Sequence, residues 1–287
     1  MATIENFATV RYTSGGVIET AVSNVAQVSL ESSVTMTKLP LSDTYENNSL
    51  LTYILTVQNT SGATLTGVRV EDDLGTFDFG TDTLTPLQYG GDAILLINGQ
   101  DATPSLGVDI SSPSALVFTL PSLSAGSTAN IVYTARVNDL APLELGGTIV
   151  NTATLSADAE CAQATASATV TVAEGANISV LKQMFPNPVV CGGTLTYSIR
   201  VYNYGNTAAE DVQLTDAFDP APENITVTRN GVPLATTEYT YENGVLTITA
   251  GSSTGDTIPA ATFARDPETG AVTVVPGMVE YVITGTL

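Results

Sequence analysis

The sequence contains no histidine and no tryptophan, and basic residues are scarce. Histidine is the commonest general base near neutral pH, and no nucleophile, base and acid form a visible set. The composition therefore argues against an enzyme that acts on external substrates. Eight lysines and arginines stand against 29 aspartates and glutamates, which gives a net charge of −21. Because nucleic-acid affinity depends on basic side chains, this balance also argues against a nucleic-acid partner.

Long apolar runs are missing as well. No stretch approaches the roughly 18 apolar residues that a membrane-spanning helix requires. Residues 1–5 have neither the basic start nor the apolar core of a signal peptide, and no Leu-Pro-x-Thr-Gly sorting signal occurs. We therefore expect no membrane span. Export would follow removal of a leader, or use another route such as lysis of a spore-forming mother cell.

Cysteine is limited to Cys161 and Cys191, which are too few for a disulfide framework. If the strands expected over 162–172 and 178–186 continue in one direction, the two cysteines lie at far ends of adjacent domains. A disulfide within one chain is therefore not expected. The sequence assigns no role to either thiol.

What the sequence has in abundance is the composition of β-strands. Thr, Val, Ala, Ser and Gly are frequent, and we find no convincing amphipathic helix. Short strand-like segments alternate with clusters of Gly, Pro, Ser, Asn and Asp. Eight such segments in the first half predict an Ig-like β-sandwich: 33–39, 51–59, 65–72, 92–98, 115–120, 129–138, 148–156 and 164–172.

The second half of the chain repeats the plan of the first. Lys182 follows Lys38 by 144 residues, and Asp216 follows Asp72 by the same distance. A Leu-Thr-Tyr motif lies 13 residues after each lysine in both halves. We therefore predict two β-sandwich domains in tandem.

The repeat is incomplete at its end. Residues 131–137 match residues 279–285, and the sequence stops two residues later. The second domain thus lacks a counterpart of 148–172, the last two strands of the first.

The missing pair of strands has a counterpart at the other end of the chain. Residues 4–30 read as two short strands joined by a turn at Gly15-Gly16, and the same pattern recurs at 149–172, where it closes the first domain. No domain precedes the N-terminal copy. The predicted parts are a donor hairpin over 1–31, a complete β-sandwich over 32–174 and an incomplete β-sandwich over 175–287.

The hairpin is expected to complete the second domain of another subunit. Leu30 and Lys38 are eight residues apart, at most about 29 Å when extended, which is too short to pass a sandwich domain. An incomplete sandwich exposes apolar core and unpaired strand edges, and an isolated hairpin is marginal in water. Such a head-to-tail contact propagates as a fibre unless it closes into a ring. In the alternative reading, the hairpin is a decoration or a boundary of the sequence.

Strand parity turns several polar residues toward the core. Lys38 shares its strand face with Val34 and Met36, so its side chain should point inward. The same test places five further residues inward: Lys182, Asp72, Asp216, Asn151 and Asn6.

A lysine, an aspartate and an asparagine in an apolar core would be costly as plain structure. Together they can form a covalent bond. Burial favours the neutral, nucleophilic lysine, and it favours the protonated aspartic acid that can polarise the asparagine carbonyl. The amine would attack the side-chain carboxamide and expel ammonia, leaving a Lys–Asn isopeptide bond. The alternative is a buried Lys–Asp ion pair that hydrogen-bonds the asparagine without a covalent bond.

Two cross-links follow from this assignment. The first domain holds all three residues, whereas the second has a lysine and an acid but receives its asparagine from the donated hairpin. The predicted bonds are Lys38–Asn151 within the chain, assisted by Asp72, and Lys182–Asn6 between chains, assisted by Asp216.

Three motifs carry a family resemblance. Asn203-Tyr-Gly-Asn-Thr-Ala, Leu214-Thr-Asp and Val150-Asn-Thr-Ala resemble the conserved-repeat domain (domain of unknown function eleven) of bacterial surface proteins. The Lys/Asp/Asn pattern resembles isopeptide-forming pilin and adhesin domains. The resemblance covers nearly the whole chain from residue 31 and implies pilin-like β-sandwiches. Those families usually carry a signal peptide and a wall anchor, so their absence here favours strand donation over sortase-type assembly.

We expect a structural subunit of an extracellular fibre, pilus-like or a spore appendage, on the surface of a bacterial cell or spore. Its partner would be further copies of itself. The alternative is an adhesin stalk or ligand-binding module of a larger surface protein, because a fragment cut from a longer array could also begin and end within a domain. Beyond its own isopeptide formation we predict no catalysis, no cofactor and no metal.

Overall fold

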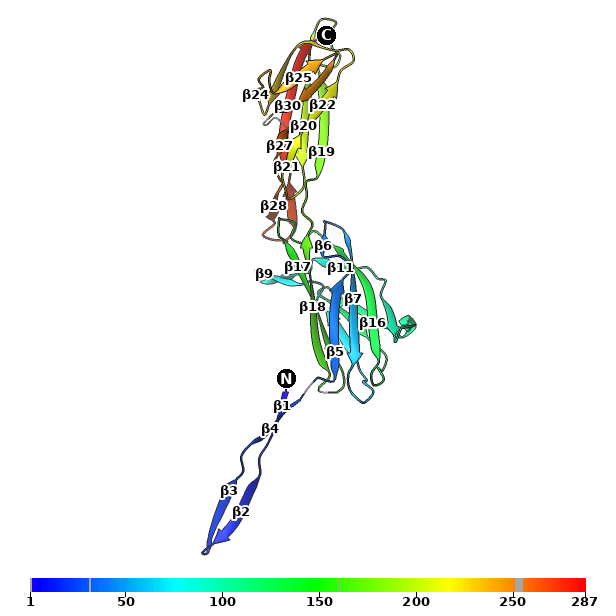
Figure 1. The fold of residues 1–287 in the computed structure, drawn as a ribbon, viewed down its shortest axis with the longest axis vertical. Helices are drawn as coiled ribbons and strands as arrows, with labels where there is room; N and C mark the ends of the chain where they lie inside the picture. The colour runs from blue at the N-terminus through cyan, green and yellow to red at the C-terminus, as the bar shows by residue number, and fades with distance from the viewer. Residues whose placement is uncertain (1, 31, 160, 251–254) are drawn as a thin grey trace. The chain divides into compact units, whose positions relative to one another are not determined.

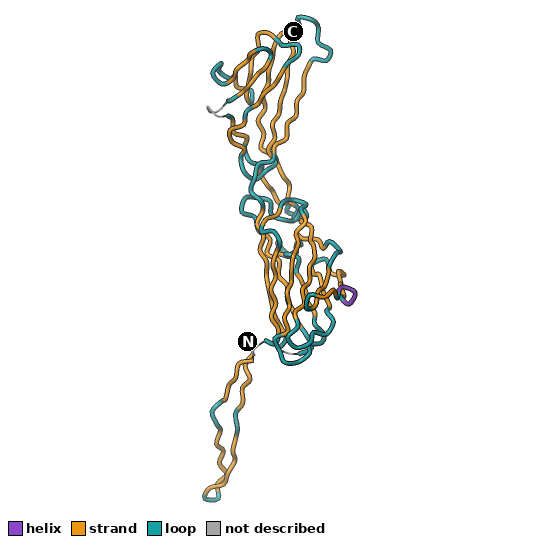
Figure 2. The backbone as a smooth tube through the Cα atoms, turned by 45° about the vertical axis from the view of Figure 1, so that its right-hand side comes forward, coloured by secondary structure: helices purple, strands orange, loops and turns teal. Residues whose placement is uncertain are grey.

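The computed structural model describes residues 2–30, 32–159, 161–250 and 255–287, and strands dominate it (Figures 1 and 2). Within these ranges the only helix is one 3-10 turn, Thr103–Ser105. No helix among them is long and apolar enough to cross a membrane. The predicted all-β class is therefore confirmed, and the chain divides into two compact units.

The first unit contains two sheets. The first sheet has the strand order β13 (Gln100–Asp101), β12 (Ile94–Ile97), β16 (Thr128–Val137), β7 (Leu50–Asn59) and β5 (Val34–Pro40), and β11 (Leu87–Tyr89) also pairs with β16. The second has the order β14 (Gly107–Ser112), β15 (Ala115–Thr119), β8 (Arg69–Asp72), β17 (Thr148–Ser156), β18 (Gln163–Val172) and β6 (Thr44–Tyr45). A small ribbon joins β9 (Phe77–Phe79) and β10 (Asp82–Leu84). All eight expected strands occur, although the strand expected over 65–72 is regular only from Arg69.

The core of the first unit lies between its two sheets. Along β7 and β16 buried residues alternate with more exposed ones, as a strand with one face in the core requires. Tyr133 of β16 stacks on Tyr53 of β7 at 5.6 Å between ring centroids. It also meets Phe118 of the opposite sheet at 5.3 Å. These contacts show that the two sheets pack face to face as a sandwich.

The second unit has a larger and a smaller sheet. The larger has the order β19 (Ile178–Phe185), β20 (Thr194–Asn203), β30 (Gly277–Thr286), β23 (Glu223–Arg229) and β24 (Val232–Pro233). The smaller has the order β22 (Leu214–Ala217), β26 (Val245–Ile248) and β25 (Tyr239–Glu242). Two ribbons complete the unit: β21 (Ala209–Val212) with β27 (Asp256–Ile258), and β28 (Thr262–Arg265) with β29 (Val272–Val275).

The loop 139–147, with Thr148 at the start of β17, groups with the second unit rather than with the first, where the sequence placed it. The Val272 amide donates to the Asp139 carbonyl at 2.7 Å, and Arg265 donates to the Leu140 carbonyl at 3.0 Å. These bonds fasten the loop to the β28–β29 ribbon.

The register of β30 corrects the repeat alignment. Tyr133 pairs with Tyr53 in the first unit, whereas the residue that pairs with Tyr197 in the second is Ile283. Since Tyr197 is the counterpart of Tyr53, Ile283 is the counterpart of Tyr133, and the match of 131–137 with 279–285 was wrong by two residues. A shift of two keeps every side chain on its original face, so strand parity could not detect it.

The N-terminal segment forms an interrupted hairpin. The strand β1 (Ala2–Asn6) pairs with β4 (Ala26–Leu30), and β2 (Thr9–Ser14) pairs with β3 (Val17–Val22). Gly15 and Gly16 make the turn with φ of 56° and 83°, left-handed values that glycine adopts without strain. Both faces of β2 and β3 are exposed along their whole length.

Candidate functional site

The first unit gathers the predicted Lys, Asp and Asn into one buried cluster. Lys38 on β5 donates to Asp72 Oδ2, at the end of β8, over 2.8 Å, and both side chains are inaccessible to solvent. The Tyr133 hydroxyl, from β16, donates to the same Asp72 oxygen. Asn151 on β17 is also fully buried, and its Nδ2 donates to the Tyr133 hydroxyl over 3.4 Å. The cluster thus connects strands of both sheets.

The environment of the cluster favours an uncharged amine. Burial lowers the pKa of Lys38 below its ordinary value, and the attraction of Asp72 opposes this only in part. Burial and the nearby Asp72 carboxylate raise the pKa of Tyr133 well above its ordinary value, so this hydroxyl stays protonated and can donate. Nucleophilic attack requires the uncharged form of the amine, which this environment favours.

The Asn151 carboxamide is held at one end and free at the other. Its nitrogen is bound by Tyr133, but its Oδ1 is buried with no hydrogen-bond partner in the part of the chain that the structure describes. An unpaired buried carbonyl costs free energy in a resting structure, on the order of 1–3 kcal/mol. The free oxygen is available to a donor such as a protonated carboxyl group, while an isopeptide bond between Lys38 and Asn151 stays a prediction.

Tyr133 is the member of this cluster that the sequence argument missed. It lies within the segment 131–137, which the repeat match includes without assigning a role to this tyrosine. Lys38 lies on β5, which pairs with β7, and β7 pairs with β16. A tyrosine on the inward face of β16 is the signal that could have identified this residue.

We expect the first unit to have lost one ammonia. A boiled Asn6→Ala chain should be lighter than its sequence by one ammonia, and a tryptic map should show no cleavage after Lys38 and a branched peptide that joins it to Asn151. Asp72→Ala should restore the unmodified mass, because the assisting acid is gone. Asp73→Asn is the matched control, since Asp73 instead binds the Gly75 and Thr152 amides. A free Lys38 in the unaltered chain would leave only the ion pair.

The second unit holds the equivalent lysine and acid in a half-open site. Lys182 on β19 contacts both carboxylate oxygens of Asp216 at 2.5 and 2.6 Å. Its amine also lies over the rings of Tyr197 and Phe218, at 5.2 and 5.3 Å from their centroids. The Lys182 side chain is nevertheless 42% exposed, whereas that of Lys38 is inaccessible. Lys182 thus reaches the buried Asp216, but the described second unit leaves its side chain partly open to solvent.

The cause of this exposure is an open strand position. In the first unit β8 is bordered by β15 and β17, whereas its counterpart β22 pairs, among the described residues, with β26 alone. The face of β19 that belongs in the core is bare in consequence. Ile178 is 41% exposed where its counterpart Val34 is 1% exposed, and Val180 is 59% exposed where Met36 is 8% exposed.

The second site also differs in its hydroxyl group. Ile283 stands where the first unit has Tyr133, so no tyrosine reaches Asp216 from this strand position. Tyr281 instead donates to Asp256, which forms a bidentate ion pair with Arg229 at 2.6 and 2.8 Å. A cross-link in the second unit would therefore depend on Lys182 and Asp216 without a bridging tyrosine.

The predicted third member, Asn6, lies at the end of β1 on the exposed hairpin. Ile4, on the same strand face, is 53% exposed, and Val28, which lies directly opposite Ile4, is 59% exposed. The hairpin thus presents a bare apolar face that includes an asparagine.

Asn59 and Asn203, which are also related by the repeat, have a structural role. The Asn59 side chain donates to the carbonyls of Ala63 and Leu123 at 2.8 and 2.9 Å, and Asn203 donates to the carbonyl of Thr207 at 2.8 Å. Asn59 thereby fixes the turn that follows β7, and Asn203 fixes the turn that follows β20. The Asn203-Tyr-Gly motif is thus explained by turn geometry.

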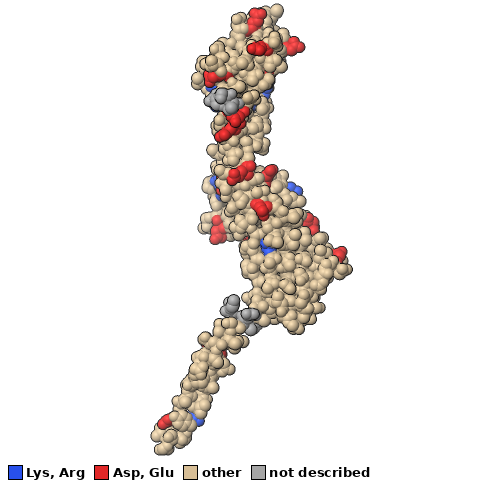
Figure 3. Space-filling model, in the orientation of Figure 1, with Lys and Arg blue, Asp and Glu red and all other residues tan. Residues whose placement is uncertain are grey.

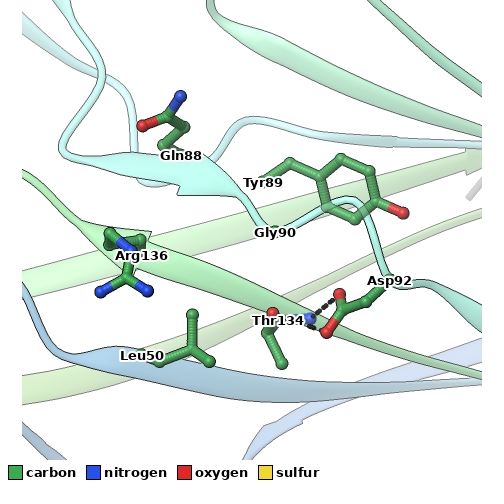
Figure 4. A pocket seen from close by; sticks show the side chains of 7 residues that line it. All are labelled: Leu50, Gln88, Tyr89, Gly90, Asp92, Thr134 and Arg136. Atoms are coloured by element: carbon green, nitrogen blue, oxygen red, sulfur yellow. Dashed lines mark hydrogen bonds between the residues drawn. The ribbon is translucent and has the colours of Figure 1, made fainter.

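A shallow hollow of about 360 Å³ lies on the first unit (Figure 4). Asp92 accepts hydrogen bonds from the Thr134 amide and hydroxyl at 2.9 and 2.8 Å, and Arg136 donates to the Asn48 carbonyl at 2.9 Å. Both charged groups that line the hollow, Asp92 and Arg136, thus already have hydrogen-bond partners within the protein. Elsewhere on the visible surface acidic side chains are scattered and basic ones are few (Figure 3).

No protein-family model and no curated protein matches the chain by sequence. Among solved structures, BcpA, the major pilin subunit of Bacillus cereus, is 13% identical and aligns over 86% of this chain and 66% of that chain, with a TM-score of 0.39. RrgB, the pilus backbone from Streptococcus pneumoniae, is 12% identical over 85% of this chain and 55% of that chain, with a TM-score of 0.34. ACE19, the collagen-binding subdomain of an Enterococcus faecalis surface protein, is 9% identical over 48% of this chain and 96% of that chain, with a TM-score of 0.33.

The chain spans less than two thirds of the length of these two pilins. Similarity at such identities concerns the fold alone. The resemblance to the conserved-repeat domain stays a prediction.

Proposed function

We propose that this protein is the structural subunit of an extracellular fibre, in which the hairpin of one copy completes the second domain of another. The observation that supports the proposal best is the open edge of β22, whose counterpart β8 is bordered by β17. An open edge beside a bare apolar face favours the addition of strands from another chain. The N-terminal hairpin is a pair of strands with no cover of its own.

The first domain supplies a template for how the hairpin docks. There, Ala153 of β17 lies opposite Asp72. The Asn-x-Ala motif that ends at Ala153 recurs in the hairpin and ends at Ala8. In the donated strand Ala8 would therefore lie opposite Asp216, and Asn6 would take the position that Asn151 has in the first domain.

The two faces of the hairpin suit this position. One face carries Ile4 with Val28, and also Val10 with Ala21 directly across from it. The other face is mostly polar but also carries Ile18 and Val22, and its polar residues are Thr3, Glu5, Thr9, Arg11, Thr13, Thr20, Gln27 and Ser29. The apolar face carries one acid, Glu19, to which Tyr12 donates. Full burial of each large apolar side chain stabilises a structure by roughly 1.5–3 kcal/mol. Docking would therefore stabilise both the hairpin and the exposed face of β19.

The contact is heterologous, because the donating and accepting surfaces are different parts of the chain. Such contacts extend head-to-tail into a filament unless they close into a ring. An isopeptide bond from Lys182 to Asn6 would then join subunit to subunit, and one from Lys38 to Asn151 would lock each first domain. The fibre would lie on the outside of a bacterial cell or spore.

A single charge on the apolar face of the hairpin should stop assembly. Val10→Asp would bury an unpaired carboxylate in the accepting core, at a cost of several kcal/mol, and should weaken docking by about 10³-fold or more. Electron micrographs of the purified full chain should show fibres, and those of the variant should show none. Thr9→Asp is the matched control, because Thr9 lies on the opposite face and should leave the fibres intact. Fibres of equal number from Val10→Asp would contradict docking through this face.

A further inference from the structure

Head-to-tail assembly would bring one end of the first domain next to one end of the second domain of another subunit. Cys161 and Cys191 lie at these two ends. Both are free thiols in the structure, Cys161 half-buried and Cys191 exposed. The Cys161 carbonyl accepts from the Ser33 amide at 3.1 Å, and its thiol lies 3.6 Å from the Ser33 hydroxyl. Ser33 immediately precedes β5. Cys161 is thereby fixed at the end of the first domain where the chain enters from the hairpin.

Cys191 lies at the opposite end of the second domain. It belongs to the loop 186–193, between the end of β19 and the start of β20. The amide of its neighbour Gly192 donates to the Leu287 carbonyl at 2.8 Å, so the loop lies beside the last residue of the chain. The start of β19, where the chain arrives from the first domain, is a full strand length away.

Docking would bring Leu30, at the end of the hairpin, to the end of the second domain where Cys191 lies. In the first domain the Val172 amide donates to the Gly147 carbonyl at 2.8 Å. The Asn-x-Ala correspondence places Ala2 at the position of Gly147, and Ala2 pairs with Leu30. Leu30 of the donated hairpin therefore takes the position of Val172, at the end of the strand that leads out of the domain.

The strand that borders β18 in the first domain indicates which residues of the second domain would lie beside the donated β4. In the first domain β18 is bordered by β6, Thr44–Tyr45. The offset of 144 residues maps β6 onto 188–189, and Val189 contacts the core of the second domain as its counterpart, the buried Tyr45, contacts that of the first. The donated β4 would thus run beside 188–189, two residues before Cys191.

Short chain lengths limit how far apart the two cysteines can lie across the junction. Cys191 is two residues from Val189, at most about 7 Å, and adjacent strands are about 4.8 Å apart. Ser33 is three residues from Leu30, at most about 11 Å, and Cys161 contacts Ser33. These limits admit the Cα separation of about 4.4–6.8 Å that a disulfide needs.

We propose that Cys191 of one subunit and Cys161 of the subunit whose hairpin it has received form a disulfide, a second covalent bond at each junction. The inference rests on the proposed head-to-tail assembly. As the S–S bond forms, the two thiols together lose two protons and two electrons. A low-molecular-weight disulfide, such as oxidised glutathione, accepts them by thiol–disulfide exchange and is reduced to two thiols. An extracellular location would preserve the bond.

The test uses Lys182→Ala chains, which lack the proposed isopeptide bond between subunits. Their fibres are exposed to oxidised glutathione and boiled in detergent without reductant. We expect a ladder of multimers that collapses to monomer on addition of dithiothreitol, and a peptide that joins Cys161 to Cys191. Adding Cys161→Ser or Cys191→Ser should remove the ladder and leave the fibres visible by electron microscopy.

A mixture of the two serine variants, both in the Lys182→Ala background, shows which cysteine the accepting subunit supplies and which the donating subunit supplies. Only a Cys161→Ser subunit that accepts the hairpin of a Cys191→Ser subunit retains both cysteines at its junction. The mixture should therefore give dimers and nothing longer, and each variant alone should give monomers. Fibres that yield monomer without reductant, or disulfides that join like cysteines, would overturn the proposal. Absence of fibres by microscopy would instead contradict the assembly on which it rests.

Discussion

Wild-type fibres boiled in detergent with reductant should run as a ladder of multimers, and Lys182→Ala should convert the ladder entirely to monomer. Lys182 is the amine held against Asp216 at 2.5 Å in the half-open second site. Without it, no nucleophile remains to attack the donated Asn6. Reductant removes any contribution from disulfides. Gel electrophoresis and the mass of the excised bands, lighter than the summed masses of the monomers by one ammonia for each junction, would measure the effect.

The bond between subunits should form only after docking. Before docking the Lys182 side chain is 42% exposed and Asn6 lies on a bare hairpin, so water surrounds both. Docking would cover the lysine with the donated strand and hold the carboxamide beside it. Such positioning can raise the effective concentration of a reacting group to about 10⁵ M or more. The reaction therefore needs no external enzyme.

Two variants separate the cross-link from the assembly. Asn6→Ala should remove the ladder as completely as Lys182→Ala, and both should still form fibres by electron microscopy. Arg200→Ala is the matched control, since Arg200 is a cation of the same domain that pairs with Glu280 at 2.9 Å, outside the site. A wild-type fibre that boils cleanly to monomer would contradict the cross-link while leaving strand donation possible.

Deletion of residues 1–30 should abolish fibres and leave a chain whose second domain is open and prone to aggregate. The bare face of β19, with Val180 59% exposed, would then have no strand to cover it. A synthetic peptide of residues 1–30 should restore solubility by forming a 1:1 complex that cannot extend further. Size-exclusion chromatography with light scattering would measure both states.

The peptide also tests the chemistry of the accepting site. The complex should become covalent, with a mass one ammonia below the sum of its parts. An Asn6→Ala peptide should bind equally but remain removable by boiling, because its docking face is unchanged. If the deleted chain still built the same ordered fibres, donation of the hairpin would be wrong.

Much of the fold could be predicted because strands have a period of two. The inward direction of Lys38, Asp72 and Asn151 follows from alternation, and all three side chains are buried in the structure. The eight strands of the first domain follow from strand-like segments bounded by turn residues, and the structure has each of them. The same period of two also limits what alternation can predict. A shift of two residues in β30 preserves alternation, so Tyr281 was matched to Tyr133 although the pairing assigns Ile283 to that position.

The sequence by itself determined that the chain is a β protein, that its second half repeats the spacing of the first, and that residues 4–30 share a pattern with residues 149–172. Local propensity, strand parity and repeat spacing carry this information, because each depends on residues close together in one strand or on a fixed offset between repeats. Only the tertiary structure decided that Tyr133 joins Asp72 to Asn151, and that Lys182 stays 42% exposed beside an open edge. Those features depend on register and on contacts between opposing sheets, where residues distant in sequence meet and parity alone cannot choose the partner.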